Sequence, residues 1–352
     1  MPVSNLKFGL SSLTTIDTIL SFSINKGFIN RGILKNNSRN LNLIRAAELY
    51  YEKQADQAEI ARELNCSPST VSRLLAEAME TGIVHITIHR PVEKIQGLAN
   101  QIRNQFNLKD VVVVSGGISN EQALENVGYA SAEFLSRIIH PNIIIGISFG
   151  VTLRHMVDRL DEFKIDEEGV EIIQLIGGLG TGDPRIDGPE LARKMAMHLR
   201  ATYSFIQAPA VLETPNLAQQ LMQESYIAKI ISRGKNAEIV LSSVGSLMDN
   251  LSSMERSGYI KKENRTRYLA NGAIGHSLGR LINENGEPIE HPYNDSVVAV
   301  SNDVLRKAKW SIGIGANPLK APVFIAAIKG HHFNVLVIDD GTAREILRLL
   351  SA

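Results

Sequence analysis

Small and hydroxyl-bearing side chains gather in the segment GISFGVTL, directly after an apolar run. Ser148 ends that run, Gly150 lets a ligand approach the backbone closely, and Thr152 begins a helical pattern. Backbone N–H groups and two hydroxyls at the start of a helix are suited to bind an anion such as phosphate. A tight strand-to-helix turn that needs glycine is the alternative explanation of the same residues.

Three further strand-like runs end in polar or charged side chains. The glycine-rich segment LIGGLGTGDPRIDG contains Asp187, whose carboxylate can accept hydrogen bonds from sugar hydroxyls. Lys320 in GANPLKAP opens a helical pattern, where an ammonium can neutralise a phosphate, although a solvated lysine is an equally good explanation. Asp339 ends the run FNVLVIDD, and a carboxylate in that position can simply cap the next helix.

A different chemistry is indicated by DQAEIARELNCSPSTVSRLLAEAMETG, residues 56–82. Asp56 and Glu59 have the spacing of a capping box at the start of a first short helix. After a break at Asn-Cys, Ser67 caps a second helix whose apolar side chains recur at helical spacing, at Val71, Leu74, Leu75 and Ala78. An upstream helix over residues 41–53 offers a third apolar face, made of Leu43, Ala46, Ala47 and Tyr50. Together these elements predict a helix-turn-helix.

The second helix of a helix-turn-helix enters the DNA major groove with its N-terminal end nearest the bases. The side chains outside the predicted core are therefore candidates for DNA contact: Gln57, Ser67, Ser69, Thr70, Ser72 and Arg73. Arg73 can fork onto a guanine, which is worth about 1–3 kcal/mol of discrimination, and Gln57 is placed to touch a phosphate. The segment IVHITIH alternates like a strand and would form a wing. A generic three-helix packing unit with solvated hydroxyls is the alternative.

The charge of this region argues against binding DNA as a single copy. Within residues 41–90, seven acidic side chains outnumber five basic ones, so non-specific affinity for DNA should be low. We therefore expect several copies to act together on a repeated site. Residues 1–40 are rich in Asn and Ser, and we expect a disordered extension there, either a basic arm that helps DNA binding or the product of a start codon chosen too far upstream.

The composition of the 352-residue chain, with 44% hydrophobic residues and a net charge of zero, is that of a globular protein with two or three domains. The single cysteine, Cys66, excludes a disulfide framework and favours a cytoplasmic location. No apolar run reaches membrane length. The histidine pairs at 85 and 89 and at 331 and 332 lack a carboxylate cluster, so we expect neither a metal site nor a cofactor.

Beyond residue 107, strand-like runs alternate with helical stretches: DVVVVSG, NIIIGIS, VEIIQLIGG, AEIVLSSVG, WSIGIGA and FNVLVIDD. Continuous Val and Ile runs separated by helices predict an α/β fold with a mostly parallel, Rossmann-like sheet covered on both faces. Ligands of such sheets bind at the carboxyl ends of the strands. The expected domains are the extension 1–40, the DNA-binding domain 41–90, a connector helix 91–107 and an effector-binding and oligomerisation domain 108–352. The apolar face of the connector could also pair two subunits.

The motifs, taken in order, resemble the SorC family of sugar-responsive bacterial transcription regulators. They are the helix-turn-helix, GISFGVTL, GAIGHSLGRLINENGEPI, NPLKAPVFIAAIKG and VLVIDDGTAREIL, and they extend from about residue 41 to the end of the chain. The resemblance implies an effector domain related to sugar-phosphate isomerases, a phosphorylated sugar or polyol as effector, operator DNA as partner, and a tetramer built from two dimers.

Matching positions carry the family's functional residues onto this sequence. Ser148, Gly150 and Thr152 correspond to the phosphate loop, Lys320 to the lysine after a glycine-rich turn, and Asp339 to a strand-end aspartate. The sequence departs from the family pattern at Val151, Ala316 and Asn317, and at His276, where an aspartate is common. His276 is then either a reader of sugar hydroxyls or a filler of the pocket.

Two other classes of function compete with an effector-controlled regulator. A sugar-phosphate isomerase-like enzyme fused to a DNA-binding domain would need a base beside its substrate, for which Asp183, Asp187, Glu190 and Asp339 are the candidates. They form no recognisable catalytic constellation, so we expect no enzyme activity. A DNA-binding scaffold whose large domain only oligomerises is the third class.

Overall fold

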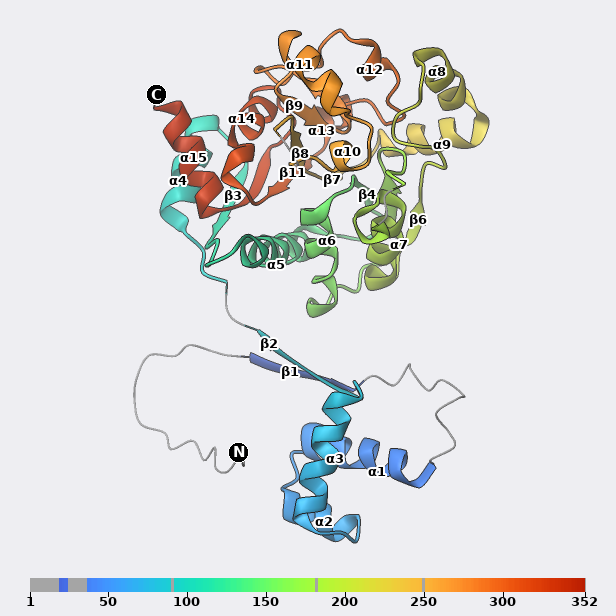
Figure 1. Cartoon of the computed structure of the whole chain (residues 1–352), viewed down its shortest axis with the longest axis vertical. Helices are drawn as coiled ribbons and strands as arrows, with labels where there is room; N and C mark the ends of the chain where they lie inside the picture. Colours follow the sequence, from blue (N-terminus) through green and yellow to red (C-terminus); the bar gives the residue numbers. More distant parts are fainter. Residues whose placement is uncertain (1–18, 25–36, 90–91, 181–182, 249–250, 352) are drawn as a thin grey trace. The chain divides into compact units, whose positions relative to one another are not determined.

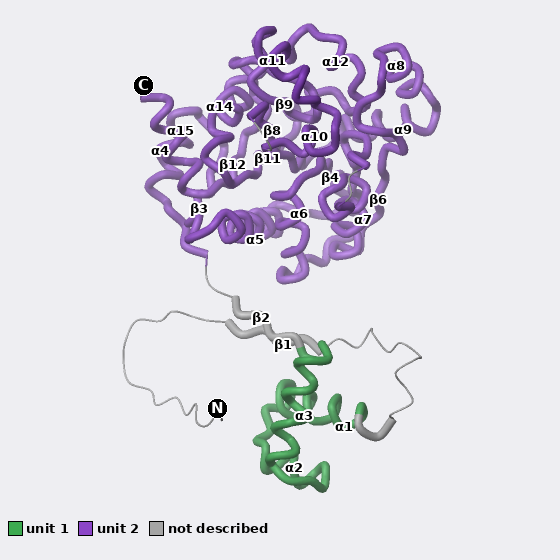
Figure 2. Tube along the Cα trace, viewed as in Figure 1, with its two compact units in different colours: residues 1–91 green, residues 92–352 purple. Residues whose placement is uncertain are grey.

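The computed structural model describes residues 19–24, 37–89, 92–180, 183–248 and 251–351. The chain divides into two compact units, Met1–Pro91 and Val92–Ala352, which are considered separately (Figure 2). The sequence-based boundary at residue 90 lies close to this division. Most of the extension predicted for residues 1–40 falls outside the described residues.

The N-terminal unit contains the predicted helix-turn-helix (Figure 1). Its helices are α1 (Asn37–Ala47), α2 (Gln57–Glu63) and α3 (Pro68–Glu80). Asp56 and Glu59 form the expected capping box, and Ser67 caps α3 by accepting the N–H of Thr70. The apolar faces meet in one core that includes Leu43, Ile60, Val71 and Leu75.

The upstream helix, predicted over residues 41–53, does not keep one α-helical register along its length. After α1 the chain continues as a short π-helix, η2 (Glu48–Glu52). A π-helix adds a residue to the turn, so it rotates the side chains that follow relative to an α-helix. As a result Leu49 is buried, whereas Tyr50, predicted to face the core, is 38% exposed.

The predicted wing strand is β2 (Val84–His89), and it pairs antiparallel with β1 (Ile19–Ile24) from the N-terminal extension. Such a two-stranded ribbon satisfies half of the backbone hydrogen-bonding groups of each strand. Of the β2 side chains only Val84 is described, and it is buried in the helix-turn-helix core.

The C-terminal unit is built on a seven-stranded parallel sheet (Figure 1). Its strands, in spatial order, are β3 (Asp110–Val114), β12 (Val335–Asp339), β11 (Trp310–Gly315), β7 (Ile239–Ser242), β4 (Ile144–Ile147), β5 (Glu171–Gln174) and β6 (Thr202–Ser204). All six predicted strands are present and parallel, which confirms the predicted fold class. The edge strand β6 was not predicted.

Helices cover both faces of the sheet because successive strand residues are apolar on both sides. Val335 and Val337 of β12 pack in the core under α5 (Asn120–Ile138), α6 (Val151–Val157) and α7 (Gly188–Leu199). Leu336 and Ile338 pack in the opposite core, under α4 (Gln96–Phe106), α14 (Ala321–Lys329) and α15 (Asp340–Leu350). Three further helices, α8 (Pro215–Gln223), α9 (Ser225–Gly234) and α13 (Asp303–Lys307), complete this layer.

The helix predicted as a connector is therefore part of the C-terminal unit. Ala99 and Ile102 of α4 are buried in the core shared with α14 and α15. The apolar face of α4 is used within the chain, so it is not free to pair two subunits.

A small antiparallel sheet was not predicted from the sequence. It consists of β8 (Val244–Ser246), β9 (Gly275–Ser277) and β10 (Arg280–Ile282), in the order β10-β9-β8. Short helices accompany it: α10 (Ser253–Arg256), α11 (Lys262–Ala270) and α12 (Pro292–Asp295). These elements enclose their own apolar cluster, which includes Met254 and Leu281.

The strand order fixes where a ligand can enter. From β4 the chain moves through β5 to the edge strand β6, and it then returns to β7, on the other side of β4, and continues to β11 and β12. Strands β4 and β7 are neighbours whose following connections run in opposite directions. This is a topological switch point, where the carboxyl ends of parallel strands leave a crevice.

Candidate functional site

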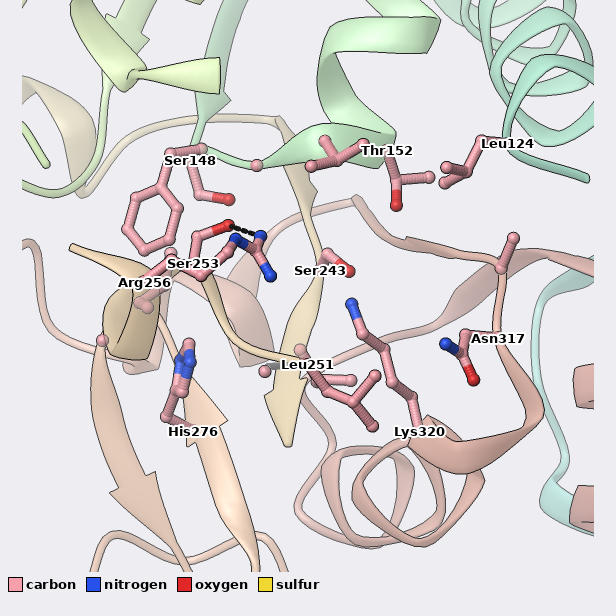
Figure 3. A pocket seen from close by; sticks show the side chains of 18 of the residues that line it. Leu124, Ser148, Thr152, Ser243, Leu251, Ser253, Arg256, His276, Asn317 and Lys320 are labelled. Atoms are coloured by element: carbon pink, nitrogen blue, oxygen red, sulfur yellow. Dashed lines mark hydrogen bonds between the residues drawn. The ribbon is translucent and has the colours of Figure 1, made fainter. Parts of the chain in front are cut away.

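A cavity of about 190 Å³ lies at this switch point. Its walls come from the segments that follow the adjacent strands β4, β7 and β11, from the small antiparallel sheet, and from the start of α5 (Figure 3). It is smaller than the cavities of about 300–1,000 Å³ that hold drug-sized ligands. The space therefore suits a small, polar molecule.

The predicted anion loop forms one wall of this cavity. Ser148 follows β4, and Gly150 adopts a φ of 126°, a conformation that glycine tolerates best, before α6 begins. Ser148 and Thr152 are both buried and line the cavity. Within the described part of the chain, neither hydroxyl makes a hydrogen bond, and both are available to a ligand.

Lys320 reaches the cavity from the opposite wall, where it ends the short 3₁₀-helix η5 (Pro318–Lys320) (Figure 3). Its ammonium forms no hydrogen bond with a described residue. Burial, and then the nearby charge of Arg256, lower the pKa of Lys320 to about 8. The folded protein therefore holds a lysine whose charged form it disfavours, and an anion in the cavity would reverse this effect.

Arg256 is a cavity residue that sequence reasoning missed. It ends α10, and its guanidinium donates to Ser253 Oγ at 2.9 Å (Figure 3). Ser243, at the end of β7, was missed as well; its hydroxyl is buried and has no partner among the described residues. Arg256 lies in a four-residue helix that carries no periodic signal, whereas Ser243 directly follows the predicted strand β7 and could have been found as a strand-end hydroxyl.

His276 lies on β9 and lines the same cavity. Its Nε2 lies 2.6 Å from Ser252 Oγ, and the residue is 4% exposed. Burial, and then the charge of Lys320, lower the pKa of His276 to about 3, so the ring is neutral near pH 7.

Two of the predicted effector residues lie elsewhere. Asp187 caps α7, and its carboxylate accepts the N–H groups of Leu179, Gly180 and Gly188. Asp339 caps α15, where it accepts the N–H and hydroxyl of Thr342. Neither lines the cavity, because each carboxylate is turned into its own loop. Helix capping, the alternative explanation for Asp339, is what this side chain does in the structure.

The positions that depart from the family pattern do surround the cavity. Val151, Ala316 and Asn317 all line it. Asn317 has a φ of 139°, in a region that favours glycine, and its side chain accepts the N–H of Leu319 at 2.9 Å. That hydrogen bond offsets part of the backbone strain at this strand end.

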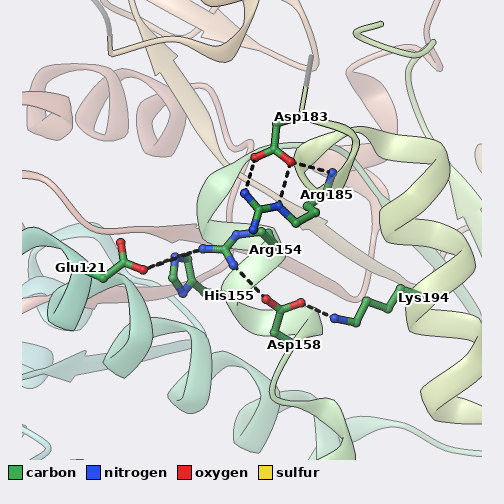
Figure 4. A network of polar contacts seen from close by, with 7 residues as sticks. All are labelled: Glu121, Arg154, His155, Asp158, Asp183, Arg185 and Lys194. Carbon is green, nitrogen blue, oxygen red and sulfur yellow. Dashed lines mark hydrogen bonds and ion pairs between the residues drawn. The ribbon is translucent and has the colours of Figure 1, made fainter. Parts of the chain in front are cut away.

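A polar network fixes the helices behind the anion loop (Figure 4). Arg154 of α6 donates to Asp158, which also accepts from Lys194 of α7 at 2.6 Å. His155 lies 3.6 Å from Glu121 of α5, next to the cavity residue Asn120. Burial, followed by Arg154, lowers the pKa of His155. The network joins α5, α6 and α7, so it holds the loop at residues 148–152 in place.

The predicted DNA-contact residues of α3 lie on its exposed side. Ser69, Ser72 and Arg73 are exposed, and Arg73 donates to Ser69 O at 3.3 Å. Ser67 Oγ lies 2.8 Å from Ser69 Oγ and 2.9 Å from Thr70 Oγ1, so it serves as a cap that links neighbouring hydroxyls. Gln57, at the start of α2, is partly exposed.

The candidate bases of the enzyme hypothesis are held by other groups. Asp183 is paired with Arg185 and Glu190 with Arg193, and these hydrogen bonds lower the pKa of each carboxyl. None of the four candidates lines the cavity. Among the described residues, no group of three or more His, Cys, Asp or Glu side chains could hold a metal ion. No helix in the described ranges is both long and apolar enough to cross a membrane.

A helix-turn-helix, combined with a ligand-sized cavity at the switch point of a parallel sheet, defines the class of ligand-responsive transcription regulators. Comparison with known proteins assigns the family. The model of the "Putative sugar-binding domain" family matches residues 90–348. The chain belongs to the SorC family of sugar-responsive bacterial transcription regulators.

The relatives match along nearly their whole length. The sorbitol operon regulator of Klebsiella pneumoniae is 30% identical over 87% of this chain and 97% of its own. The deoxyribonucleoside regulator of Bacillus subtilis (strain 168) is 28% identical over 86% of this chain and 96% of its own. The crystal structure of the full-length Klebsiella regulator has a TM-score of 0.67 and covers 88% of this chain and 99% of its own, at 29% identity.

Proposed function

We propose that this regulator binds a phosphorylated sugar or polyol in the cavity at the sheet's switch point, and that the ligand changes its affinity for operator DNA. One observation carries the proposal. The cavity gathers the hydroxyls of Ser148, Thr152 and Ser243 and the ammonium of Lys320, none of which is hydrogen-bonded to a described residue. Buried polar groups are normally paired, so a set of unpaired donors around a cation points to an absent anionic partner.

The charge of the cavity supports a phosphate. Two cations, Lys320 and Arg256, line it, and no acidic side chain does so among the described residues. A phosphate dianion needs N–H dipoles, hydroxyl donors and a cation, all of which the walls supply. Two of the relatives are named as a sorbitol operon regulator and a deoxyribonucleoside regulator, and these names fit an effector that contains a sugar or polyol.

Sensing is favoured over catalysis because none of the described residues that line the cavity carries a carboxylate that could act as a base. We place the DNA contacts on α3, chiefly at Ser69, Ser72 and Arg73, and the protein in the cytoplasm. Since the DNA-binding region is not basic, we further propose that a tetramer, as a dimer of dimers, engages repeated half-sites. Operator fragments cut to one half-site should then bind far more weakly in a titration at fixed salt.

The test of the effector site compares matched ligands and matched variants. Fructose 6-phosphate and related sugar phosphates should raise the melting temperature and change operator affinity, whereas unphosphorylated fructose should do much less. Lys320→Ala should weaken the response, and Lys329→Ala, at an exposed lysine near the end of α14, should not. The proposal is wrong if a panel of sugar and polyol phosphates gives no thermal shift, or if Lys320→Ala responds like the parent protein.

A further inference from the structure

We infer that His276 presents a hydrogen-bond donor, its Nδ1–H, to the effector, and that Ser252 is the positioning residue that holds it in this form. The pocket should therefore prefer a phosphorylated sugar acid, which offers a carboxylate to this donor, over the phosphorylated polyol of the same length. The inference rests on the proposed function, since it assumes that a phosphate occupies the cavity.

The hydrogen bonds at Ser252 decide which nitrogen of His276 carries the proton. Ser252 is buried, and its Oγ accepts the N–H of Met254 at 3.1 Å while lying 2.6 Å from His276 Nε2. If Nε2 donated to Oγ, the hydroxyl proton would need another acceptor, and no described residue supplies one. An unpaired buried donor is costly, so the hydroxyl donates to Nε2 and the proton of the neutral ring resides on Nδ1.

The His276 ring packs closely against the small antiparallel sheet. Gly245 of β8 lies opposite His276, and a Cβ built on it would come within 1.9 Å of Nε2, so only glycine leaves room for the ring here. With Nε2 bonded to Ser252, Nδ1 is the nitrogen without a hydrogen-bond partner among the described residues.

A hydrogen-bond donor at His276 distinguishes a ligand carboxylate from a ligand hydroxyl. A carboxylate oxygen accepts from N–H without any proton of its own, and such charge-assisted bonds are about twice as strong as neutral ones. A ligand hydroxyl can accept as well, but its own proton must then find an acceptor, and the described lining has no carboxylate. Arg256 reaches the cavity from the helix that Ser252 caps, and it adds a second donor on the same side (Figure 3).

The experiment compares two ligands that differ only at C1. We would titrate the full-length protein calorimetrically with 6-phosphogluconate and with sorbitol 6-phosphate, and also with the five-carbon pair ribonate 5-phosphate and ribitol 5-phosphate. The acid should bind about tenfold more tightly than the polyol of the same length. Ser252→Ala should reduce this ratio to about two or less, and Ser252→Thr, which keeps the hydroxyl, should restore it. His276→Asp should invert the preference, because a carboxylate accepts from hydroxyls and repels the acid.

The neighbouring serine provides the matched control. Ser253 lies beside Ser252 but bonds to Arg256 and not to His276. Ser253→Ala should therefore weaken the binding of the acid and the binding of the polyol far more evenly than Ser252→Ala does. A general folding defect would instead change operator binding and the melting temperature. Equal or tighter binding of the polyols by the parent protein, or an unchanged ratio in a folded Ser252→Ala variant, overturns the inference alone. Failure of all four ligands to bind overturns the proposed function as well.

Discussion

The two units keep their functional polar groups in opposite surroundings. On α3, the hydroxyls of Ser67, Ser69 and Thr70 are bonded to one another at the protein surface. In the cavity, Ser148, Thr152 and Lys320 are partly or fully buried and have no hydrogen-bond partner among the described residues. Surface groups can exchange water for DNA at little cost to folding, whereas buried unpaired groups destabilise the unit until a ligand pairs them. We therefore expect the C-terminal unit to show the larger gain in stability when its proposed ligand binds.

The largest expected effect tests the close contact between Gly245 and the His276 ring in the cavity wall. Gly245→Ala should lower the free energy of unfolding of the C-terminal unit by about 3 kcal/mol, because the new methyl group displaces the buried His276 ring. Gly82→Ala in the N-terminal unit should cost only about 1 kcal/mol, since Gly82 has a positive φ but no neighbour within 4 Å. Urea unfolding followed by fluorescence of the single tryptophan, Trp310, reports the C-terminal unit, and hydrogen exchange of the α3 amides reports the N-terminal unit. Equal losses from the two variants would contradict the close contact at β8.

The next effect concerns the exposed surface of α3. Arg73→Ala should weaken binding to the specific operator by about 1–3 kcal/mol and have little effect on random DNA. The stability of the N-terminal unit should be almost unchanged, because Arg73 is exposed and its one hydrogen bond to a described residue is with the carbonyl of Ser69. Fluorescence anisotropy with both DNAs at one salt concentration measures the difference. Equal loss on both sequences would make Arg73 a phosphate contact.

The pH should change effector binding in the cavity, through the buried ammonium of Lys320, and should leave DNA binding by the exposed side of α3 unchanged. Since the pKa of Lys320 is lowered to about 8, the ammonium is present below that pH and lost above it. Effector affinity should therefore fall by up to about tenfold per pH unit above pH 8. It should also fall below about pH 6, where the phosphate gains a proton. Titrations from pH 5.5 to 9.5 check this, and Lys320→Met should remove the fall above pH 8.

The smallest effect is a gain in stability. Lys320→Met should raise the free energy of unfolding of the ligand-free protein by about 1 kcal/mol near pH 7, because it removes a charge that burial disfavours. The sign follows from proton binding: between pH 8 and the ordinary lysine pKa of 10.5, the unfolded chain holds more protons than the folded one. The parent protein should thus gain stability as the pH rises through this window, and the variant should not. A destabilised variant would show that the lysine stem, and not its charge, dominates.

The parts of the structure that the sequence predicts are those encoded by a pattern of neighbouring residues. The helix-turn-helix is local, and its capping box and apolar spacing lie within 27 consecutive residues from Asp56 to Gly82. The six Val- and Ile-rich strands were predicted correctly because buried parallel strands are continuous apolar runs. The short, exposed edge strand β6 carries no such pattern. Tyr50 was misplaced because nothing in its neighbours indicates a π-helix.

The candidate site was only partly predictable, since it is assembled from distant segments. Ser148, Thr152, Lys320 and His276 do line one cavity, and their roles there stay predictions. Asp187 and Asp339 were chosen as strand-end carboxylates, but such a side chain can bind either a ligand or its own helix, and here both cap helices. Arg256 lies in a four-residue helix too short for periodicity to place it, and Ser243 follows a predicted strand but has no feature that sets it apart from other serines. Three-dimensional proximity, and not local pattern, identifies them.

The switch point between β4 and β7 also has a meaning for how this regulator can evolve. The anion loop belongs to the first half of the sheet, whereas Ser243, Ser252, Arg256 and His276 belong to segments after the chain has turned back. On the proposed function, the phosphate is bound from both stretches, by the anion loop and by Lys320, whereas Ser252 and His276, the residues proposed to select the other end of the ligand, lie only in the second. Substitutions at these two residues should therefore change which ligand is preferred while the phosphate site is kept, which offers one route by which a single architecture could serve regulators of different operons.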